Sequence, residues 1–275
     1  MTTTSRLNVI VVNFRTSGLT IRCVESIIAQ SVARPEEIIV VDNFSQDDSV
    51  PVLRAKLPVG VKLIASDRNA GFGAGVNEGY RHTDAEYLLV LNPDTYFEFD
   101  SVTPVMDYMG NDESVGLVGL DLVNPDRSRQ YSARRFYSIL DIGARRVSFL
   151  GNLFTSRVDR HLMRDAWRDG KPFAAEWVMG TGFVIRSDLY ARLQGMDEAY
   201  FLYMEDVDLC ARVWRAGLRV ICFPGAQLVH DHQRSSAASP FSFAGRAHLR
   251  SLVMFGRRFS LPLIRSPGLD KIMRS

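Results

Sequence analysis

Four runs of apolar and β-branched residues dominate the first hundred positions of the chain. These strand-like runs occupy residues 7–14, 36–45, 61–67 and 87–94. Helical spacing of apolar residues appears between them, over residues 17–31, 49–57 and 73–83. Strands that alternate with helices predict a parallel, doubly wound α/β sheet.

Each predicted strand is followed by polar residues. In chain order these are Asn13, the pair Asp42 and Asn43, Asp67, and Asp94. Parallel strands share their carboxyl edge, and such sheets bind ligands there, so these side chains are candidates for ligand contacts. A simple turn is the alternative for residues 92–94, because Asn, Pro and Asp all favour turns.

The composition is typical of a folded globular protein, since 275 residues with 46% hydrophobic content can bury a substantial core. No segment approaches about 18 consecutive apolar residues, so no transmembrane helix is expected, and no signal-peptide pattern opens the chain. Cys23, Cys210 and Cys222 share no metal-ligand spacing. We expect reduced, buried thiols in a cytoplasmic protein.

Positive charge is concentrated in two segments, although the net charge is only +2. Ten Arg and three Asp lie between Arg127 and Arg168, and residues 240–275 hold six Arg and one Lys against Asp270 alone. Such patches suit a phosphate-bearing partner or an anionic membrane surface. Ordinary solvated helix faces are the alternative.

Seven segments occur in order along residues 7–236: VIVVNF, EEIIVVDNFSQDDS, DRNAGFGAGVNEG, LLVLNPDTYF, VMGTGFVIR, FLYMEDVDLCARVWRAGLRV and LVHDHQRSS. As an ordered set they resemble the inverting family 2 glycosyltransferases, which have the GT-A fold. The stretches RVDRHLMRDAW and AAEWVMGTGFVIR are most similar to bacterial rhamnosyltransferases that build polysaccharides on lipid-linked acceptors.

This resemblance implies a division of the chain. A GT-A catalytic domain with a mainly parallel sheet is expected over residues 1–239. Its nucleotide-sugar half would end at about residue 100, and its acceptor and catalytic half would follow. A basic amphipathic, helical tail is expected over residues 240–275.

The resemblance also implies donor-binding roles for residues at the strand ends. In the family, the first strand and the VVDN turn hold the nucleotide base and ribose, and the segment equivalent to RNAGFGAGVN adds contacts. Asp42 suits this role because a carboxylate accepts from a pyrimidine N–H, and glycines before a helix let an anion approach the backbone. The residues expected to bind the donor are Val12, Asn13, Phe14, Asp42, Asn43, Arg68, Asn69, Gly71, Phe72 and Asn77.

The family's metal motif implies a divalent cation near Asp94. Where Asp-x-Asp is common, this chain has Asn92, Pro93 and Asp94. One carboxylate is then left to bind Mg²⁺ or Mn²⁺ bridging the diphosphate of a sugar nucleotide, with Asn92 beside it. His230 matches a histidine that relatives place near the metal and His232 is a weaker match; a surface-loop histidine is the alternative for both.

The family places its catalytic base in an acidic pair, here Glu205 and Asp206. Helical spacing follows the pair, so the acids open a helix, where capping is the alternative role. The resemblance assigns the base to Asp206, an acceptor contact to Glu205 and a structural role to Asp208. A wall between donor and acceptor is expected from Trp177, Gly180, Thr181 and Gly182.

Two other classes of protein were weighed. A nucleotidyltransferase would carry a Gly-rich, basic turn after its first strand, whereas residues 13–20 are NFRTSGLT. A non-catalytic sugar-nucleotide binder could lose the acids that this chain retains. We therefore expect a glycosyltransferase and no nucleic-acid partner.

The resemblance favours dTDP-rhamnose as donor and a lipid-linked glycan as acceptor, and a UDP-sugar with a soluble acceptor is the alternative. The C-terminal tail interleaves apolar residues with arginines. It is expected either to lie on an anionic membrane surface, at the inner face of the plasma membrane, or to pack on the catalytic domain as a terminal helix.

Overall fold

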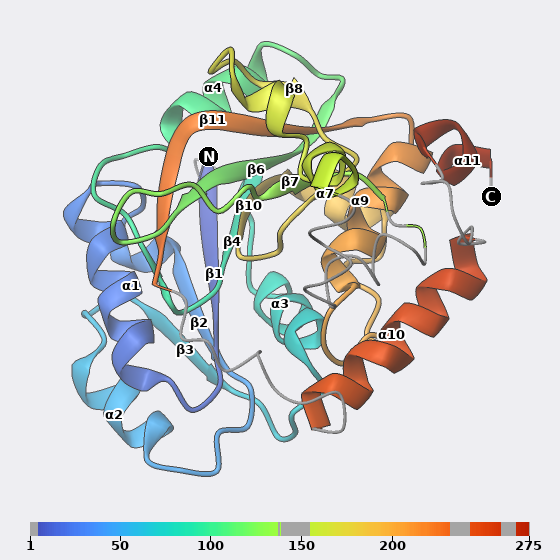
Figure 1. The fold of residues 1–275 in the computed structure, drawn as a ribbon. Coiled ribbons are helices and arrows are strands. Elements are labelled where there is room, and N and C mark those ends of the chain that lie inside the picture. The colour runs from blue at the N-terminus through green and yellow to red at the C-terminus, as the bar shows by residue number, and fades with distance from the viewer. Residues whose placement is uncertain (1–4, 137, 139–154, 232–242, 260–267, 275) are drawn as a thin grey trace.

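A computed structural model of the chain describes all residues except 1–4, 137, 139–154, 232–242, 260–267 and 275. Among the described residues, one mixed sheet of nine strands forms the centre of the molecule. Its order is β3-β2-β1-β4-β10-β6-β11-β5, with β8 attached to β11. β7 and β9 form a separate two-stranded ribbon, and helices lie around the sheet (Figure 1).

The strands have the following bounds: β1 Leu7–Asn13, β2 Ile38–Asp42, β3 Lys62–Ala65, β4 Tyr87–Leu91, β5 Thr95–Tyr96, β6 Val115–Val123, β7 Ala133–Arg134, β8 Phe173–Ala174, β9 Trp177–Val178, β10 Gly182–Arg186 and β11 Arg219–His230. The α-helices are α1 Ser17–Ala29, α2 Ser49–Lys56, α3 Phe72–Tyr80, α4 Thr103–Gly110, α7 Thr155–His161, α8 Ser187–Arg192, α9 Glu205–Arg215, α10 Phe243–Phe259 and α11 Gly268–Arg274. Two 3-10 helices are η1 Pro35–Glu37 and η2 Arg164–Trp167.

The amino-terminal part has the parallel, doubly wound arrangement that the sequence predicts. β1 pairs in parallel with β2 and with β4, and β2 pairs in parallel with β3. Alternate residues of β1 enter two different clusters: Val9 and Val11 pack with α1 and α2, whereas Ile10 and Val12 pack with α3. Burial on both faces explains why the strand is a continuous apolar run.

The second strand begins later than the sequence indicates. Glu36 and Glu37 were expected in the strand but belong to η1, and β2 begins at Ile38. Pro35 explains the difference, because its fixed φ suits the first position of a helical turn. The predicted helices over α1, α2 and α3 are confirmed, and the three cysteines are buried free thiols, as expected.

The register brings the polar strand ends to one edge. Asn13 at the end of β1 is paired with Asp42 at the end of β2. Leu91, the last residue of β4, is paired with Val11. The first and second strands and the turn after the fourth therefore present their polar residues side by side.

The carboxy-terminal part makes the sheet mixed. β10 runs antiparallel between β4 and β6, and Gly182 at its start is paired with Leu91 at the end of β4. The turn that leads into β10 consequently lies at the same edge as the polar strand ends. This placement brings residues from the second half of the chain to the carboxyl edge of β4.

The C-terminal helices pack on the rest of the protein (Figure 1). Phe255 and Phe259 of α10 and Ile272 of α11 are fully buried in the same cluster as α9. Arg215 of α9 lies over the ring of Phe259 and donates from Nε to the carbonyl of Ile272 (2.9 Å). One face of the tail therefore belongs to the core. The tail prolines, Pro262 and Pro267, lie outside the described residues.

None of the described helices is long and apolar enough to cross a membrane.

The loop of residues 193–204, which joins α8 to α9, passes directly over the start of α3. Gly71 there has a φ of +98°, and a Cβ added to it would lie 2.2 Å from the carbonyl oxygen of Phe201. Only glycine fits such a close backbone approach. The start of α3 and the loop before α9 are thus in direct contact.

Candidate active site

Asn13 and Asp42 form a buried polar pair at the end of β1 and β2. The Nδ2 group of Asn13 donates to Oδ2 of Asp42 (2.7 Å), and the hydroxyl of Thr20 donates to Oδ1 of Asn13 (2.7 Å). The backbone N–H of Ser45 donates to Oδ1 of Asp42 (2.9 Å). These bonds fix the two turns that follow the strands, and a buried polar group requires such partners.

Two aromatic side chains are exposed in these turns. Phe14 is 41% exposed and Phe44 is 37% exposed, and Phe44 has a φ of +61°. Aromatic faces at this edge suit stacking on a nucleotide base. The sequence analysis included Phe14 but missed Phe44, whose signal in the sequence is its position directly after Asn43.

Asn43 ties the end of β2 to the start of α3. Its Nδ2 group donates to the carbonyl of Gly71 (2.9 Å) and to Oδ1 of Asn69 (3.1 Å). Asn69 in turn accepts from the backbone N–H of Gly71 (3.0 Å). Asn43 also lines a cavity of about 350 Å³ together with Arg68. The structure therefore brings this part of the predicted donor set together.

Four other residues expected at the site pack into the protein. Val12 and Trp177 are buried, and Phe72 is partly buried against the same cluster. The indole N–H of Trp177 donates to a backbone carbonyl (2.9 Å). A Cβ at Gly182 would lie 2.4 Å from a leucine of β11. These residues support the edge of the sheet from the core.

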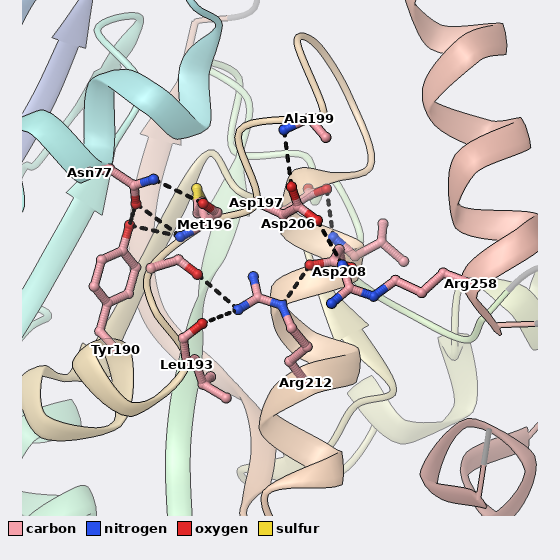
Figure 2. Close-up of polar contacts among 12 residues, drawn as sticks. Asn77, Tyr190, Leu193, Met196, Asp197, Ala199, Asp206, Asp208, Arg212 and Arg258 are labelled. Carbon is pink, nitrogen blue, oxygen red and sulfur yellow. Dashed lines mark hydrogen bonds and ion pairs between the residues drawn. The ribbon is translucent and has the colours of Figure 1, made fainter.

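The side-chain amide of Asn77 is hydrogen-bonded to the loop before α9 (Figure 2). Its amide donates to the carbonyl of Met196 (2.8 Å). It also donates to the carboxylate of Glu198 (3.0 Å). Its Oδ1 accepts from the hydroxyl of Tyr190 (2.6 Å) and the N–H of Met196 (2.9 Å). The amide therefore has no hydrogen-bonding capacity left for a ligand, and its observed task is to hold residues 196–198.

Asp94 and His230 meet where β4 and β11 end. His230 Nε2 lies 3.3 Å from Asp94 Oδ2, and the N–H of Asp231 donates to the carbonyl of Asp94 (2.9 Å). Asp94 Oδ1 is buried and has no hydrogen-bond partner among the described residues. A carboxylate and an imidazole in this arrangement suit a divalent cation. His232 lies outside the described residues.

Gln130 fixes the orientation of His230. Its NH₂ group donates to the carbonyl of His230 (2.9 Å) and to Oδ1 of Asn124 (2.6 Å), so its Oε1 is left as the acceptor. That Oε1 lies 2.7 Å from Nδ1 of His230. The proton of a neutral imidazole is then on Nδ1, and the Nε2 lone pair faces Asp94. The sequence analysis missed Gln130, which is 100 residues from His230 in the chain.

No cluster of three or more His, Cys, Asp or Glu side chains within the described part of the chain could hold a metal ion by itself. Asp94 and His230 would supply two ligands, and a bound diphosphate and water would supply the others. The orphaned Oδ1 of Asp94 and the imidazole nitrogen facing it fit this arrangement.

Asp206 stands at the start of α9 and is held by two backbone donors. Its Oδ2 accepts from the N–H of Gly180 (2.8 Å), and its Oδ1 accepts from the N–H of Val207 (2.8 Å). A Cβ at Gly180 would lie 3.1 Å from the Cβ of Asp206, so the turn and the helix are in close contact. Asp206 itself is partly exposed to solvent.

The turn before β10, residues 179–181, contacts both Asp206 of α9 and the turn of residues 92–94. Gly180 holds Asp206, and the next residue, Thr181, accepts the N–H of Asn92 (2.9 Å). Asn92 is two residues before Asp94. Two consecutive residues of one turn therefore connect the predicted base to the predicted metal ligand.

Burial raises the pKa of both acids at the start of α9. The pKa of Glu205 is raised to about 8 by desolvation and then by the charge of Asp206. The pKa of Asp206 is raised by desolvation, against which the Gly180 and Val207 N–H groups and the charge of Arg134 act. Glu205 Oε2 is buried without a hydrogen-bond partner in the described structure. We therefore assign the negative charge to Asp206 and the proton to Glu205 near neutral pH.

Arg134 of β7 is a further residue that the sequence analysis did not identify. Its guanidinium lies over the ring of Trp177, 5.2 Å from the ring centroid, and its positive charge lowers the pKa of Asp206. Arg134 is paired with Trp177 across the β7–β9 ribbon. The ribbon thus brings one positive charge from the Arg-rich segment to the acceptor side.

Comparison with known proteins identifies the family. The family described as "Glycosyl transferase family 2" matches residues 8–179, more than half of the chain, and "Glycosyl transferase family group 2" matches residues 133–251. The chain belongs to glycosyl transferase family 2. This membership confirms the family expected from the sequence.

The curated relatives of this chain include rhamnosyltransferases from two species. The N-acetylglucosaminyl-diphospho-decaprenol L-rhamnosyltransferase of Mycobacterium tuberculosis is 28% identical over 242 residues, which are 82% of this chain and 76% of the relative. Rhamnosyltransferase WbbL of Escherichia coli K12 is 29% identical over 180 residues, which are 65% of this chain and 64% of WbbL.

Solved glycosyltransferases share the fold. The mannosyltransferase PcManGT from Pyrobaculum calidifontis, in complex with GDP-Man and Mn²⁺, has a TM-score of 0.64 at 20% identity. The match covers 99% of this chain and 70% of the mannosyltransferase chain. GalNAc-T7 with UDP, GalNAc and Mn²⁺ has a TM-score of 0.62 at 13% identity, and the match covers 100% of this chain and 54% of the GalNAc-T7 chain. The GT-A fold expected from the sequence is confirmed.

The two acids of this family 2 enzyme can be distinguished by isosteric substitution. We expect Asp206→Asn to lower kcat by ~10²- to 10⁴-fold, because the amide cannot accept a proton. We expect Glu205→Gln to keep kcat within about tenfold, because an amide replaces a carboxyl that is already neutral. Steady-state kinetics and donor affinity measured by calorimetry check both variants, and donor affinity should be unchanged in Asp206→Asn.

The pH profile supplies a control on this assignment. Only the ionised Asp206 accepts a proton and burial raises its pKa, so kcat should fall as the pH is lowered through that raised pKa. If Glu205→Gln were the inactive variant and Asp206→Asn turned over at the parent rate, the assignment of the base would be wrong.

Proposed function

We propose that this enzyme transfers L-rhamnose from dTDP-rhamnose, with inversion, to a hydroxyl group of a lipid-linked glycan in cell-surface polysaccharide synthesis. The observation that supports transfer is the turn before β10, in which Gly180 is hydrogen-bonded to Asp206 and Thr181 to Asn92, two residues before Asp94. The two rhamnosyltransferase relatives support the donor sugar, and the diphospho-decaprenol in one relative's name supports a lipid-linked acceptor.

The reaction is a single displacement at the anomeric carbon. Asp206 takes the proton of the acceptor hydroxyl while that oxygen forms a bond to the anomeric carbon. The bond from the anomeric carbon to the diphosphate oxygen breaks on the opposite face, and its electron pair leaves with the nucleoside diphosphate. Protonated Glu205 would donate a hydrogen bond to the acceptor. No covalent sugar–enzyme intermediate is required.

The donor binds along the edge formed by β1, β2 and the start of α3. Phe14 and Phe44 would contact the nucleotide base, and Asn43, Arg68 and Asn69 would line its path to the diphosphate. Asp94 and His230 would hold Mg²⁺ or Mn²⁺, and that cation would neutralise charge on the departing diphosphate. Both solved relatives named above were determined with Mn²⁺.

A screen of donors tests the proposal. Purified enzyme is incubated with an undecaprenyl-type diphospho-GlcNAc acceptor and with dTDP-rhamnose, UDP-glucose or GDP-mannose, and release of nucleoside diphosphate is measured. We expect dTDP release to exceed release from the other donors by at least ~10-fold and to need acceptor. Asp206→Asn supplies the background rate.

The same assay tests the metal ligands. A chelator should abolish transfer, and Asp94→Ala should weaken Mn²⁺ binding seen by electron paramagnetic resonance, because one of two protein ligands is lost. Turnover of a UDP-sugar but not of dTDP-rhamnose would favour the alternative donor. Full activity in chelator would exclude the cation.

The outward face of α10 supports a lipid-linked acceptor. Five exposed residues lie at helical spacing along it: Arg246, Leu249, Arg250, Val253 and Arg257. Leu249 and Val253 are 57% and 47% exposed, and residues 243–259 contain no acid. We propose that this face rests on anionic lipid at the inner face of the plasma membrane, while the opposite face packs in the core.

Vesicle binding tests the membrane contact. The full chain should sediment with vesicles that contain anionic phosphatidylglycerol, and much less at high salt or with neutral phosphatidylcholine. Replacing Arg246, Arg250 and Arg257 by Glu should abolish sedimentation, whereas Arg54→Glu on α2 should not. If the protein stayed in the supernatant with every lipid, the proposed membrane contact would be wrong and this face of α10 would be a solvent-exposed surface. A truncation is unsuitable, because it would remove Phe255 and Phe259 from the core.

A further inference from the structure

α10 is tied to α9 by a charge network around the buried carboxylate of Asp208 (Figure 2). Arg258 Nη1 lies 2.7 Å from Oδ2 of Asp197 in the 193–204 loop and 3.0 Å from Oδ1 of Asp208 in α9. Asp208 is completely buried, and Arg258 is about one-third exposed. One guanidinium nitrogen therefore joins three separate segments of the chain.

Asp208 also organises a second arginine. Its Oδ2 accepts from Nε of Arg212 (2.6 Å), and Nη1 of Arg212 donates to the carbonyls of Leu193 and Gly195, both at 2.8 Å. Arg212 thus holds the first residues of the 193–204 loop, and Arg258 holds its middle. A buried carboxylate needs such compensation, and the structural role expected for Asp208 agrees with these contacts.

The last residues of the same loop are strained. Tyr203 and Met204 have φ values of 64° and 73°, and Glu205 follows directly. Left-handed backbone in residues other than glycine persists only where the surroundings impose it. α10 supplies part of that restraint, because the hydroxyl of Ser251 donates to the carbonyl of Leu202 (3.0 Å) and His248 packs on the ring of Tyr203.

We propose that Arg258 is a positioning residue for the transfer reaction. Through Asp197 and Asp208 it holds the 193–204 loop and the first turn of α9, and thereby keeps Asp206 against the turn before β10. It touches no reacting atom. This inference rests on the proposed role of Asp206 as base. It implies that α10, which lies outside the seven sequence segments that resemble the family, helps to position the active-site residues.

The kinetic test compares three single variants with the parent. Arg258→Ala should lower kcat by ~10- to 100-fold and change KM for the sugar nucleotide by less than about threefold, because the base moves while the donor edge does not. Arg258→Lys keeps a positive charge and should recover most of the loss. Arg54→Ala, which removes an exposed arginine of α2, should behave as the parent.

A second pair of variants keeps the test informative if Arg258→Ala folds poorly. Asp197→Ala removes the contact with the loop but leaves Arg258 beside Asp208, and it should also lower kcat selectively. The double variant Arg258→Ala/Asp197→Ala should be no slower than Arg258→Ala alone, because the two residues act through one contact.

Hydrogen exchange separates this inference from the proposed function. Amides of residues 196–207 should exchange faster in Arg258→Ala and Asp197→Ala, and those of β1 should not, whatever the donor sugar is. Absence of any transfer by the parent would defeat the proposed function and leave the exchange test in place. Parent-like kcat in a folded Arg258→Ala, or an equal loss in kcat and donor affinity, would overturn the positioning role.

Discussion

The hydrogen bond from the backbone of Gly180 to the carboxylate of Asp206 is the interaction on which the rest of the site depends. It lowers the pKa of an acid whose pKa burial raises, and its donor cannot itself titrate. The antiparallel placement of β10 beside β4 puts this donor at the carboxyl edge of the parallel strands. Thr181, the next residue, then binds the turn that carries Asp94. One short turn therefore contacts both the proposed base and the turn that carries the proposed metal ligand.

The 193–204 loop contacts both the start of α3 and the start of α9. It lies on Gly71 at the donor edge, it is bonded to Asn77 of α3, and it ends at the acids of α9. α10 holds the same loop from the other side through Arg258. Because the loop touches both substrate sides, a change in any of these contacts is expected to affect the placement of the base more than the fold of the sheet.

Much of the amino-terminal half could be predicted from the sequence. Its strands are buried on both faces, so they are unbroken apolar runs, and the helices between them have clear periodicity. Local patterns also indicated that Glu205 and Asp206 open a helix, which α9 confirms. The predicted start of β2 was wrong because the 3-10 helix of residues 35–37 lies before the apolar run and leaves that run unbroken.

The contacts that complete the site depend on residues far apart in the chain. Gln130 is 100 residues from His230, and Arg258 is 61 residues from Asp197. No local spacing encodes such pairs. Asn77 shows the converse: its sequence context suggested a ligand contact, but the folded chain uses its amide to hold another loop. The ligand-binding roles of the other donor-side residues remain predictions.

The central claim is that Asp206 drives a single displacement with the leaving diphosphate on the opposite face of the sugar. The most direct measurement is the anomeric configuration of the product, read from its one-bond carbon–hydrogen coupling by nuclear magnetic resonance. A configuration inverted relative to the donor sugar nucleotide is expected. Retention of the donor's configuration would contradict the account, because it would require a covalent intermediate or attack from the face of the departing diphosphate.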